Sequence, residues 1–157
     1  MVSPTEWGPN AWQLLHGLAE RIGNTRTTHM DRDQRNELRL TLRHFGALLP
    51  CQKCQMHYRE WLHKYPPDKW ISSPFGSDLK DEMRTWLFRL HTSVNEQNNS
   101  ISTIQLEQLP DLYNSVDLQQ CFIKLKSIYE RGVQSRVLKA EEWKVASKHL
   151  SLLLLTL

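Results

Sequence analysis

The chain has 157 residues and a mass of 18.5 kDa, which is the size of one domain with an appendage. Hydrophobic residues make up 39% and charged residues 24%, a composition typical of folded rather than disordered proteins. The net charge of +3 is spread along the chain, which argues against the clustered basic face of a nucleic-acid-binding protein. The longest apolar run, residues 152–155, is far shorter than the ~20 residues that span a bilayer. We therefore expect neither a nucleic-acid partner nor a transmembrane segment.

Cysteine content and the first residues bear on the compartment. Three cysteines are too few for a disulfide scaffold. No apolar stretch follows Met1, so we expect no cleavable secretory signal. Together these features favour a cytoplasmic protein.

Apolar residues recur at helical spacing through the first half of the chain. A first helix is expected over residues 12–22, after a break at Gly8 and Pro9. A second is expected from Asp31 until just before Pro50.

Pro50 is predicted to be the first residue of a third helix, which stops near Tyr65, because proline suits the first helical position. Residues 66–77 indicate a loop. Asp78 is predicted to cap a fourth helix, which carries apolar residues as far as Val94.

Beyond the fourth helix, residues 95–100 are polar and indicate a turn or short linker. Further helices are expected over residues 101–109, 117–131 and 139–155. The chain is therefore predicted to be all-α. Its four-helix bundle core spans residues 1–98, and a helical C-terminal extension spans residues 99–157 and packs on the core or forms a subunit interface.

Two cysteines are spaced as Cys51-x-x-Cys54 at a predicted helix start, where helix polarity favours a thiolate. A dithiol at such a place exchanges with other disulfides. Two other interpretations stay open. One is half of a zinc site completed by His57 and His63, although both lie on the same predicted helix as the cysteines. The other is a chance pair.

Ring and amide side chains lie at helical intervals that suggest a ligand site. Trp12 and His16 are four apart on the first predicted helix, as are His91 and Asn95 at the end of the fourth. His57 follows the second cysteine by three residues. Each residue alone is as well explained by a packed core. Together with the cysteine pair, they suit a planar, hydrogen-bonding cofactor such as a flavin, and hence dithiol oxidation.

Three motifs over roughly residues 5–98 resemble the Erv/ALR family of FAD-linked sulfhydryl oxidases. They are Trp7-Gly8-Pro9-x-x-Trp12-x-x-Leu15-His16, Pro50-Cys51-x-x-Cys54-x-x-His57 and Leu90-His91-x-x-Val94-Asn95. The resemblance implies a four-helix bundle with a short fifth helix and FAD held at one end. It implies that Cys54 is the sulfur beside the flavin and that Cys51 is the outward sulfur that meets the substrate.

The same resemblance implies a set of cofactor-binding positions. They are Gly8, Trp12, His16, His57, His91, Asn95 and, on the fifth helix, Tyr113.

The function implied is an FAD-dependent sulfhydryl oxidase. Electrons pass from substrate dithiols through the cysteine pair to FAD and then to O₂, which yields hydrogen peroxide and leaves disulfides in substrate proteins. Family members commonly form homodimers through helices 1 and 2. The compact form looks most like members from large cytoplasmic DNA viruses, which would place the protein in host cytoplasm or the virion. The alternative function is a helical zinc-binding interaction module.

The chain departs from the family pattern in three ways. Thr92 stands where members often have asparagine, which puts one cofactor contact in doubt. A second, shuttle CxxC and a further structural disulfide are both missing. The electron donor would then be a protein dithiol substrate or a separate thiol carrier. Cys121 lies on an apolar helical face and is expected to be a buried thiol, with an intermolecular bridge or relay as the alternative.

Overall fold

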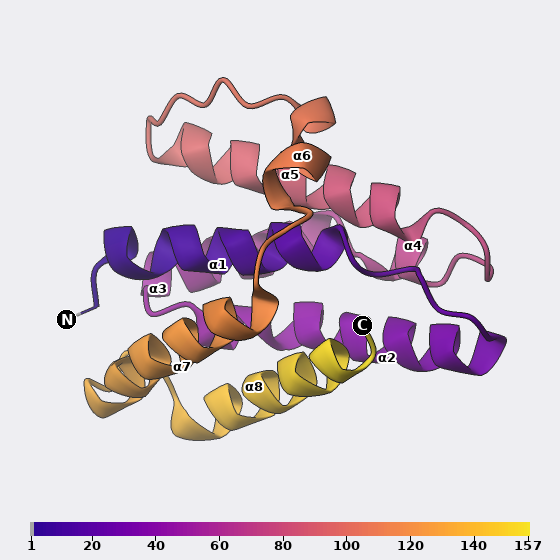
Figure 1. Cartoon of the computed structure of the whole chain (residues 1–157). Helices are drawn as coiled ribbons and strands as arrows, with labels where there is room; N and C mark the ends of the chain where they lie inside the picture. Colours follow the sequence, from indigo (N-terminus) through magenta and orange to yellow (C-terminus); the bar gives the residue numbers. More distant parts are fainter. Residues whose placement is uncertain (1) are drawn as a thin grey trace.

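The computed structural model describes residues 2–157, and this part of the chain is helical without strands (Figure 1). The all-α prediction is confirmed. The helices are α1 (Pro4–Ala19), α2 (Thr28–His44), α3 (Gln52–Lys64), α4 (Asp68–Ile71), α5 (Leu79–Gln97), α6 (Leu109–Tyr113), α7 (Leu118–Gln134) and α8 (Ala140–Leu155), with 3₁₀ turns η1 (Phe45–Leu48) and η2 (Leu106–Gln108).

The predicted break before the first helix is wrong. Helix α1 begins at Pro4, capped by the Ser3 hydroxyl, and continues through Gly8 and Pro9. Pro4 suits a helix start because its missing N–H has no partner there anyway. Pro9 costs the helix one hydrogen bond because it has no N–H. The helical turn before it carries Trp7, whose burial in the core favours continuing the helix through Pro9.

Two more helix starts differ from prediction. Helix α2 begins at Thr28 with Thr27 as its cap, three residues before Asp31. Helix α3 begins at Gln52 with Cys51 as its cap, so Pro50 precedes the helix instead of opening it. In both cases a side chain that accepts a backbone N–H fixes the start.

The predicted loop over residues 66–77 contains the short helix α4. Arg35, which is buried in α2, holds this segment. Its guanidinium donates to the Ile71 carbonyl at 2.8 Å and to the Ser73 hydroxyl at 3.0 Å, and it pairs with the Asp31 carboxylate at 2.8 Å. Buried charges need such partners, and these ones also shape the loop.

The segment after the fourth bundle helix was predicted least well. Helix α5 continues to Gln97, so Asn95 is helical. Residues 101–105 form no helix, and Pro110 lies in the first turn of α6 instead of ending a helix. Helix α6 takes the place of the predicted short fifth helix.

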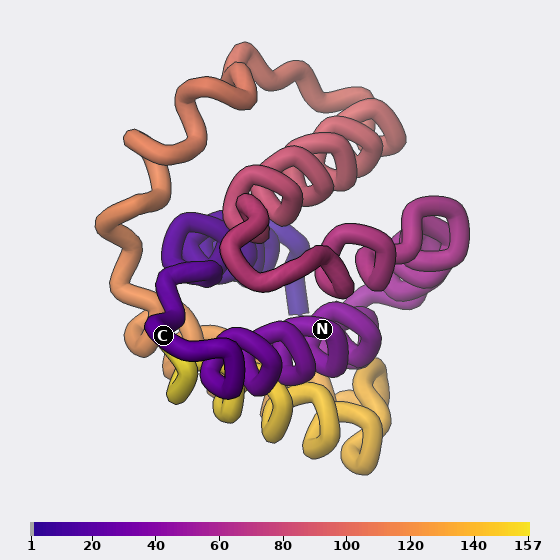
Figure 2. Tube along the Cα trace, turned by 90° about the vertical axis from the view of Figure 1, so that its right-hand side faces the viewer, coloured from indigo at the N-terminus to yellow at the C-terminus, as the bar shows by residue number. Residues whose placement is uncertain are grey.

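Helices α1, α2, α3 and α5 form the bundle. Figure 2, turned by 90°, shows them grouped around a common interior, with the segment that joins α5 to α7 passing down one flank. Helix α6 on this segment packs on α1. Within residues 2–157, no helix has the length and apolar character that a membrane crossing requires.

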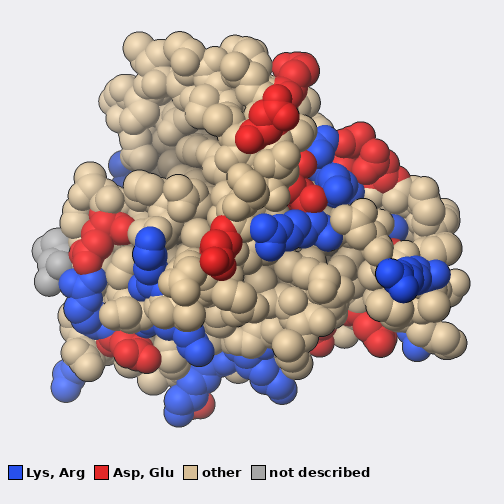
Figure 3. Space-filling model, viewed as in Figure 1, with Lys and Arg blue, Asp and Glu red and all other residues tan. Residues whose placement is uncertain are grey.

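Helices α7 and α8 form a further layer that packs on α1 and α2. Asp117 caps α7, and α8 starts within a residue of its predicted start. The domain boundary at residue 98 stays a prediction, but side chains from both sides of it belong to one buried cluster. Acidic and basic residues intermingle on the face shown in Figure 3.

Candidate active site

The cysteine pair lies at the N-terminus of α3 and is joined as a disulfide, with the two Cα atoms 5.2 Å apart. Cys51 is the cap residue, and its sulfur accepts a hydrogen bond from the Cys54 N–H at 3.2 Å. The first N–H groups of a helix have no acceptor within it, and the helix dipole is positive at this end. This position therefore stabilises a thiolate whenever the disulfide is opened.

Tyr58 fixes α3 against the rest of the bundle. Within Gln52–Lys64, all of it described by the structure, Tyr58 is the one buried side chain. Its hydroxyl donates to the Leu42 carbonyl, and burial raises the pKa of its phenol, so it stays protonated. Gly46 allows this fit, because a Cβ there would lie 3.1 Å from the Tyr58 ring. Tyr58 therefore sets the position of the disulfide one turn away.

A cavity of about 570 Å³ lies beside Cys54, between α1, α3 and α5. Cys54 lines it, whereas Cys51 is not among the lining residues that the structure describes. Six of the seven predicted cofactor-binding residues line it: Gly8, Trp12, His57, His91, Asn95 and Tyr113. The volume and mixed aromatic and polar lining are those of a small-molecule site.

His16 lies one layer behind this wall. The His91 ring stacks on Trp12 with centroids 3.8 Å apart, and His16 Nε2 lies 3.2 Å from His91 Nδ1. Tyr113 stacks on His16 with ring centroids 4.7 Å apart. His16 lines a second, adjoining cavity of about 370 Å³ together with His91, Asn95 and Tyr113. His91 and Tyr113 line both cavities, so the rings of His16, His91 and Tyr113 form a partition between the two.

Burial keeps both histidines of this partition neutral. It lowers the pKa of His91 to about 4, and burial together with the nearby His91 lowers that of His16 to about 3. In a neutral pair one ring donates to the other. His16 Nδ1 is then left buried with no hydrogen-bond partner in residues 2–157. Such an orphaned atom is unusual and marks a place for a ligand or water.

These low pKa values predict an acid-sensitive fold. His16 is only 2% exposed, so the unfolded chain binds a proton near pH 6.5 that the folded chain rejects until about pH 3. Unfolding by urea should therefore become easier as the pH falls from 6.5 to 4. His16→Gln should remove up to about 1.4 kcal/mol per pH unit of that slope in the flavin-free protein. The same substitution at the exposed His29 is the control. An equal change of slope in the two variants would contradict the assignment.

His57 bridges α3 and α5. Its Nε2 lies 2.9 Å from the Ser93 hydroxyl, and its Nδ1 contacts the Gln97 amide oxygen. Thr92, at the position where the family often has asparagine, donates its hydroxyl to the Phe88 carbonyl of its own helix at 2.9 Å. The Thr92 hydroxyl is thus engaged within α5, whereas Ser93 and Gln97 tie α5 to α3.

Several lining residues escaped prediction, among them Trp7, Lys53, Gln97, Asn98 and Ser100. Lys53 lies between the two cysteines in the sequence, so its position next to the redox pair could have been predicted. The last three were assigned to a linker, although Gln97 is helical.

The geometry does not support the zinc alternative. His57 is engaged with Ser93 and Gln97, and His63 is exposed two turns along α3. The cysteines are bonded to each other. In the part of the chain that the structure describes, no three His, Cys, Asp or Glu side chains lie together as metal ligands do.

Comparison with curated proteins gives two relatives, each 28% identical. One is the "Mitochondrial FAD-linked sulfhydryl oxidase erv1" of Schizosaccharomyces pombe, matched over 92 residues, 59% of this chain and 45% of the relative. The other is the "Probable FAD-linked sulfhydryl oxidase R368" of Acanthamoeba polyphaga mimivirus, matched over 97 residues, 60% of this chain and 59% of the relative. The chain thus spans about half the length of these relatives.

No solved structure matches the chain significantly. The model of the Erv1 / Alr family matches residues 9–113, which is more than half of the chain and includes the disulfide, the lining of α5 and Tyr113. The chain belongs to the Erv1/Alr family.

Proposed function

We propose that this protein is an FAD-linked sulfhydryl oxidase that introduces disulfides into substrate proteins. The observation that carries the proposal is the position of the Cys51–Cys54 disulfide, with the Cys54 sulfur in the wall of an aromatic cavity. Family membership and the names of the two relatives support it.

The cavity fits FAD by its chemistry. Trp12 and Tyr113 offer flat faces for ring systems, and Asn95 offers an amide for hydrogen bonds. Trp7 also lines the cavity, and its buried indole N–H has no acceptor among residues 2–157. A cofactor oxygen would satisfy it.

Lys53 is the one formally charged side chain among the described residues that line the cavity. It lies in the first turn of α3, one turn before His57, which contacts Gln97. Lys53 therefore faces the end of α5, where Asn98 and Ser100 add polar groups to the lining. We assign this mouth of the cavity to the pyrophosphate of FAD, which needs positive charge and donors.

Lys53→Met should accordingly weaken FAD binding by about tenfold, the value of one charge-assisted hydrogen bond, and should flatten its salt dependence. Riboflavin, which lacks phosphate, should bind equally well before and after the change. Titration of the flavin-free protein with each ligand measures this. Lys64→Met, at the exposed far end of α3, is the control. Equal losses for riboflavin and FAD would place Lys53 beside the ring instead.

The chain's own part in the reaction is disulfide exchange. A substrate thiolate attacks the Cys51 sulfur, the Cys51–Cys54 bond breaks, and Cys54 leaves as a thiolate stabilised by the α3 N-terminus. The second substrate thiol, losing its proton, then displaces Cys51 and closes the substrate disulfide. Bound FAD would accept the two electrons held by the cysteine pair and pass them to O₂, which gives hydrogen peroxide.

The proposed substrates are protein thiols. Because the chain has no second CxxC, the electrons would reach Cys51–Cys54 directly from the substrate or through a separate thiol carrier. A cytoplasmic or virion location stays a prediction. The homodimer that the resemblance implies would use helices 1 and 2, and α7 and α8 cover both.

An oxygen electrode tests the proposal. The purified, flavin-loaded protein should consume O₂ when given dithiothreitol or a reduced protein, with hydrogen peroxide formed in equal amount. Flavin-loaded protein that consumes no O₂ with either donor would refute the oxidase.

A further inference from the structure

Helices α7 and α8 cover α1 and α2 from outside the bundle (Figures 1 and 2). The family match ends at residue 113, before α7 begins at Leu118. This layer is therefore an addition to the part of the chain that the family shares.

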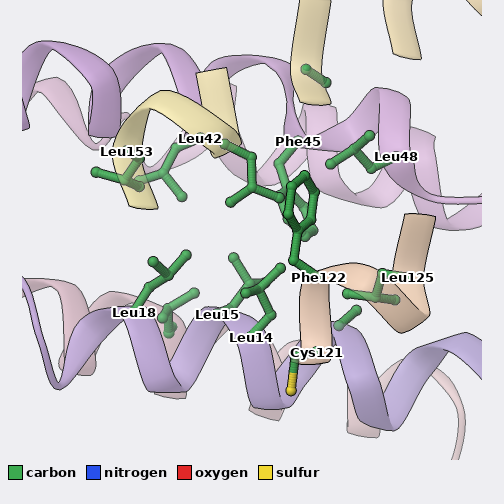
Figure 4. Packing of buried hydrophobic residues seen from close by; sticks show 14 of the residues in the cluster. Leu14, Leu15, Leu18, Leu42, Phe45, Leu48, Cys121, Phe122, Leu125 and Leu153 are labelled. Carbon is green, nitrogen blue, oxygen red and sulfur yellow. The ribbon is translucent and has the colours of Figure 1, made fainter. Parts of the chain in front are cut away.

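The contact is a continuous apolar interior. Figure 4 shows Phe122 of α7 between Leu15 of α1 and the Leu42 and Phe45 side chains of the second helix and its 3₁₀ turn. Phe122 is 5% exposed, and Leu153 of α8 is fully buried in the same cluster. Without this layer, α1 and α2 would present a bare apolar face, which soluble proteins normally cover.

Gly17 of α1 packs directly against the segment that leads into α7. A Cβ on Gly17 would lie 2.7 Å from Leu118 Cδ2 and 3.2 Å from Val116 Cβ, so a larger residue would require the Leu118 side chain to shift. The small size of Gly17 therefore allows this close fit.

Polar contacts fix the far end of the layer. Gln34 of α2 donates through Nε2 to the Thr156 carbonyl at 3.2 Å, and His149 of α8 pairs with Glu37 of α2 at 3.0 Å. These polar groups find their partners only when α8 lies at one position along α2. The contacts therefore fix the position of the layer on the bundle.

The outward sides of α7 and α8 are charged. Exposed residues there include Lys124, Lys126, Glu130, Glu141 and Lys148. In Figure 3 several basic side chains, with acidic ones among them, lie along the lower edge, where Figure 1 places these two helices. The layer thus presents a solvated surface to the outside and an apolar one to the bundle.

We propose that α7 and α8 occupy, within one chain, the α1–α2 face that a second copy would otherwise cover, so that the protein works as a monomer. The described residues that line the cavity beside Cys54 lie between Pro4 and Tyr113, before α7 begins at Leu118. The α7–α8 layer therefore covers the bundle without contributing to the cavity.

Sedimentation equilibrium of the full chain, from low micromolar to several hundred micromolar, tests this. The expected mass is 18.5 kDa at every concentration. Twice that mass would overturn the proposal, whether two copies pair through α1 and α2 or exchange their α7 and α8 helices. Oxidase activity plays no part in this readout, so its outcome is independent of the proposed function.

Phe122→Glu supplies a second test, with its exposed neighbour Ile123→Glu as control. The buried carboxylate should lift α7 from α1, bare the apolar face and cause self-association, while Ile123→Glu stays at 18.5 kDa. A folded Phe122→Glu protein that stays monomeric throughout would also overturn the proposal. If Phe122→Glu unfolds, the mass of the unaltered chain decides alone.

Discussion

Replacing Cys54 by serine is expected to reduce dithiol-driven oxygen consumption to background while FAD stays bound. Cys54 is the sulfur in the cavity wall, so its loss leaves Cys51 without a partner and no thiolate beside the cofactor site. Serine nearly preserves the size of the side chain, and the rest of the lining is untouched. Oxygen uptake and the flavin absorption band, measured on one preparation, separate the two effects.

Cys121→Ser is the matched control. Cys121 is unpaired and buried where α7 meets α1, its sulfur 3.7 Å from the Gln13 side-chain oxygen, and it does not line the cavity. Burial also raises the pKa of its thiol, which makes it a poor nucleophile. Turnover of a small dithiol should therefore survive this change. Full activity in Cys54→Ser, or its loss in Cys121→Ser, would contradict the assigned roles.

Trp12→Ala is expected to lower FAD affinity roughly 100-fold, because a central aromatic anchor typically contributes more than about 2 kcal/mol to binding. Trp12 lines the cavity and stacks on His91 with ring centroids 3.8 Å apart. Its removal takes away an aromatic face for the cofactor and leaves the His91 ring without its stacking partner. Fluorescence titration of the flavin-free protein with FAD measures the change.

Trp143→Ala on α8 controls for general loss of stability, because this indole is also half-buried but lies outside the cavity. It should bind FAD as the unaltered chain does. Equal losses in the two variants would show that Trp12 acts through stability alone.

Helix boundaries were predictable where a cap and an apolar period agreed. Asp78 and Asp117 do accept the N–H groups of the helices they were expected to start. The helix break predicted at Gly8 and Pro9 was wrong because the free energy gained by burying Trp7 outweighs the loss of one backbone hydrogen bond at Pro9. Local sequence carries no sign of such a tertiary contact.

Site residues were predictable where two of them lie four residues apart on one helix, as Trp12 and His16 do on α1 and His91 and Asn95 do on α5. The depth of each residue was not: His16 lies behind His91, because only the packing of α5 on α1 decides which ring faces the cavity. Gln97 was missed since its contact with His57 joins residues 40 positions apart. Pairs so distant are invisible to periodicity.

The most direct test of the account is an anaerobic titration of the purified protein with a dithiol, followed by its visible absorption. We predict one bound FAD per chain and bleaching of its band once the Cys51–Cys54 disulfide has been reduced, with the colour restored by air. A colourless protein that takes up no FAD, or a flavin band that excess dithiol leaves unchanged, would contradict it.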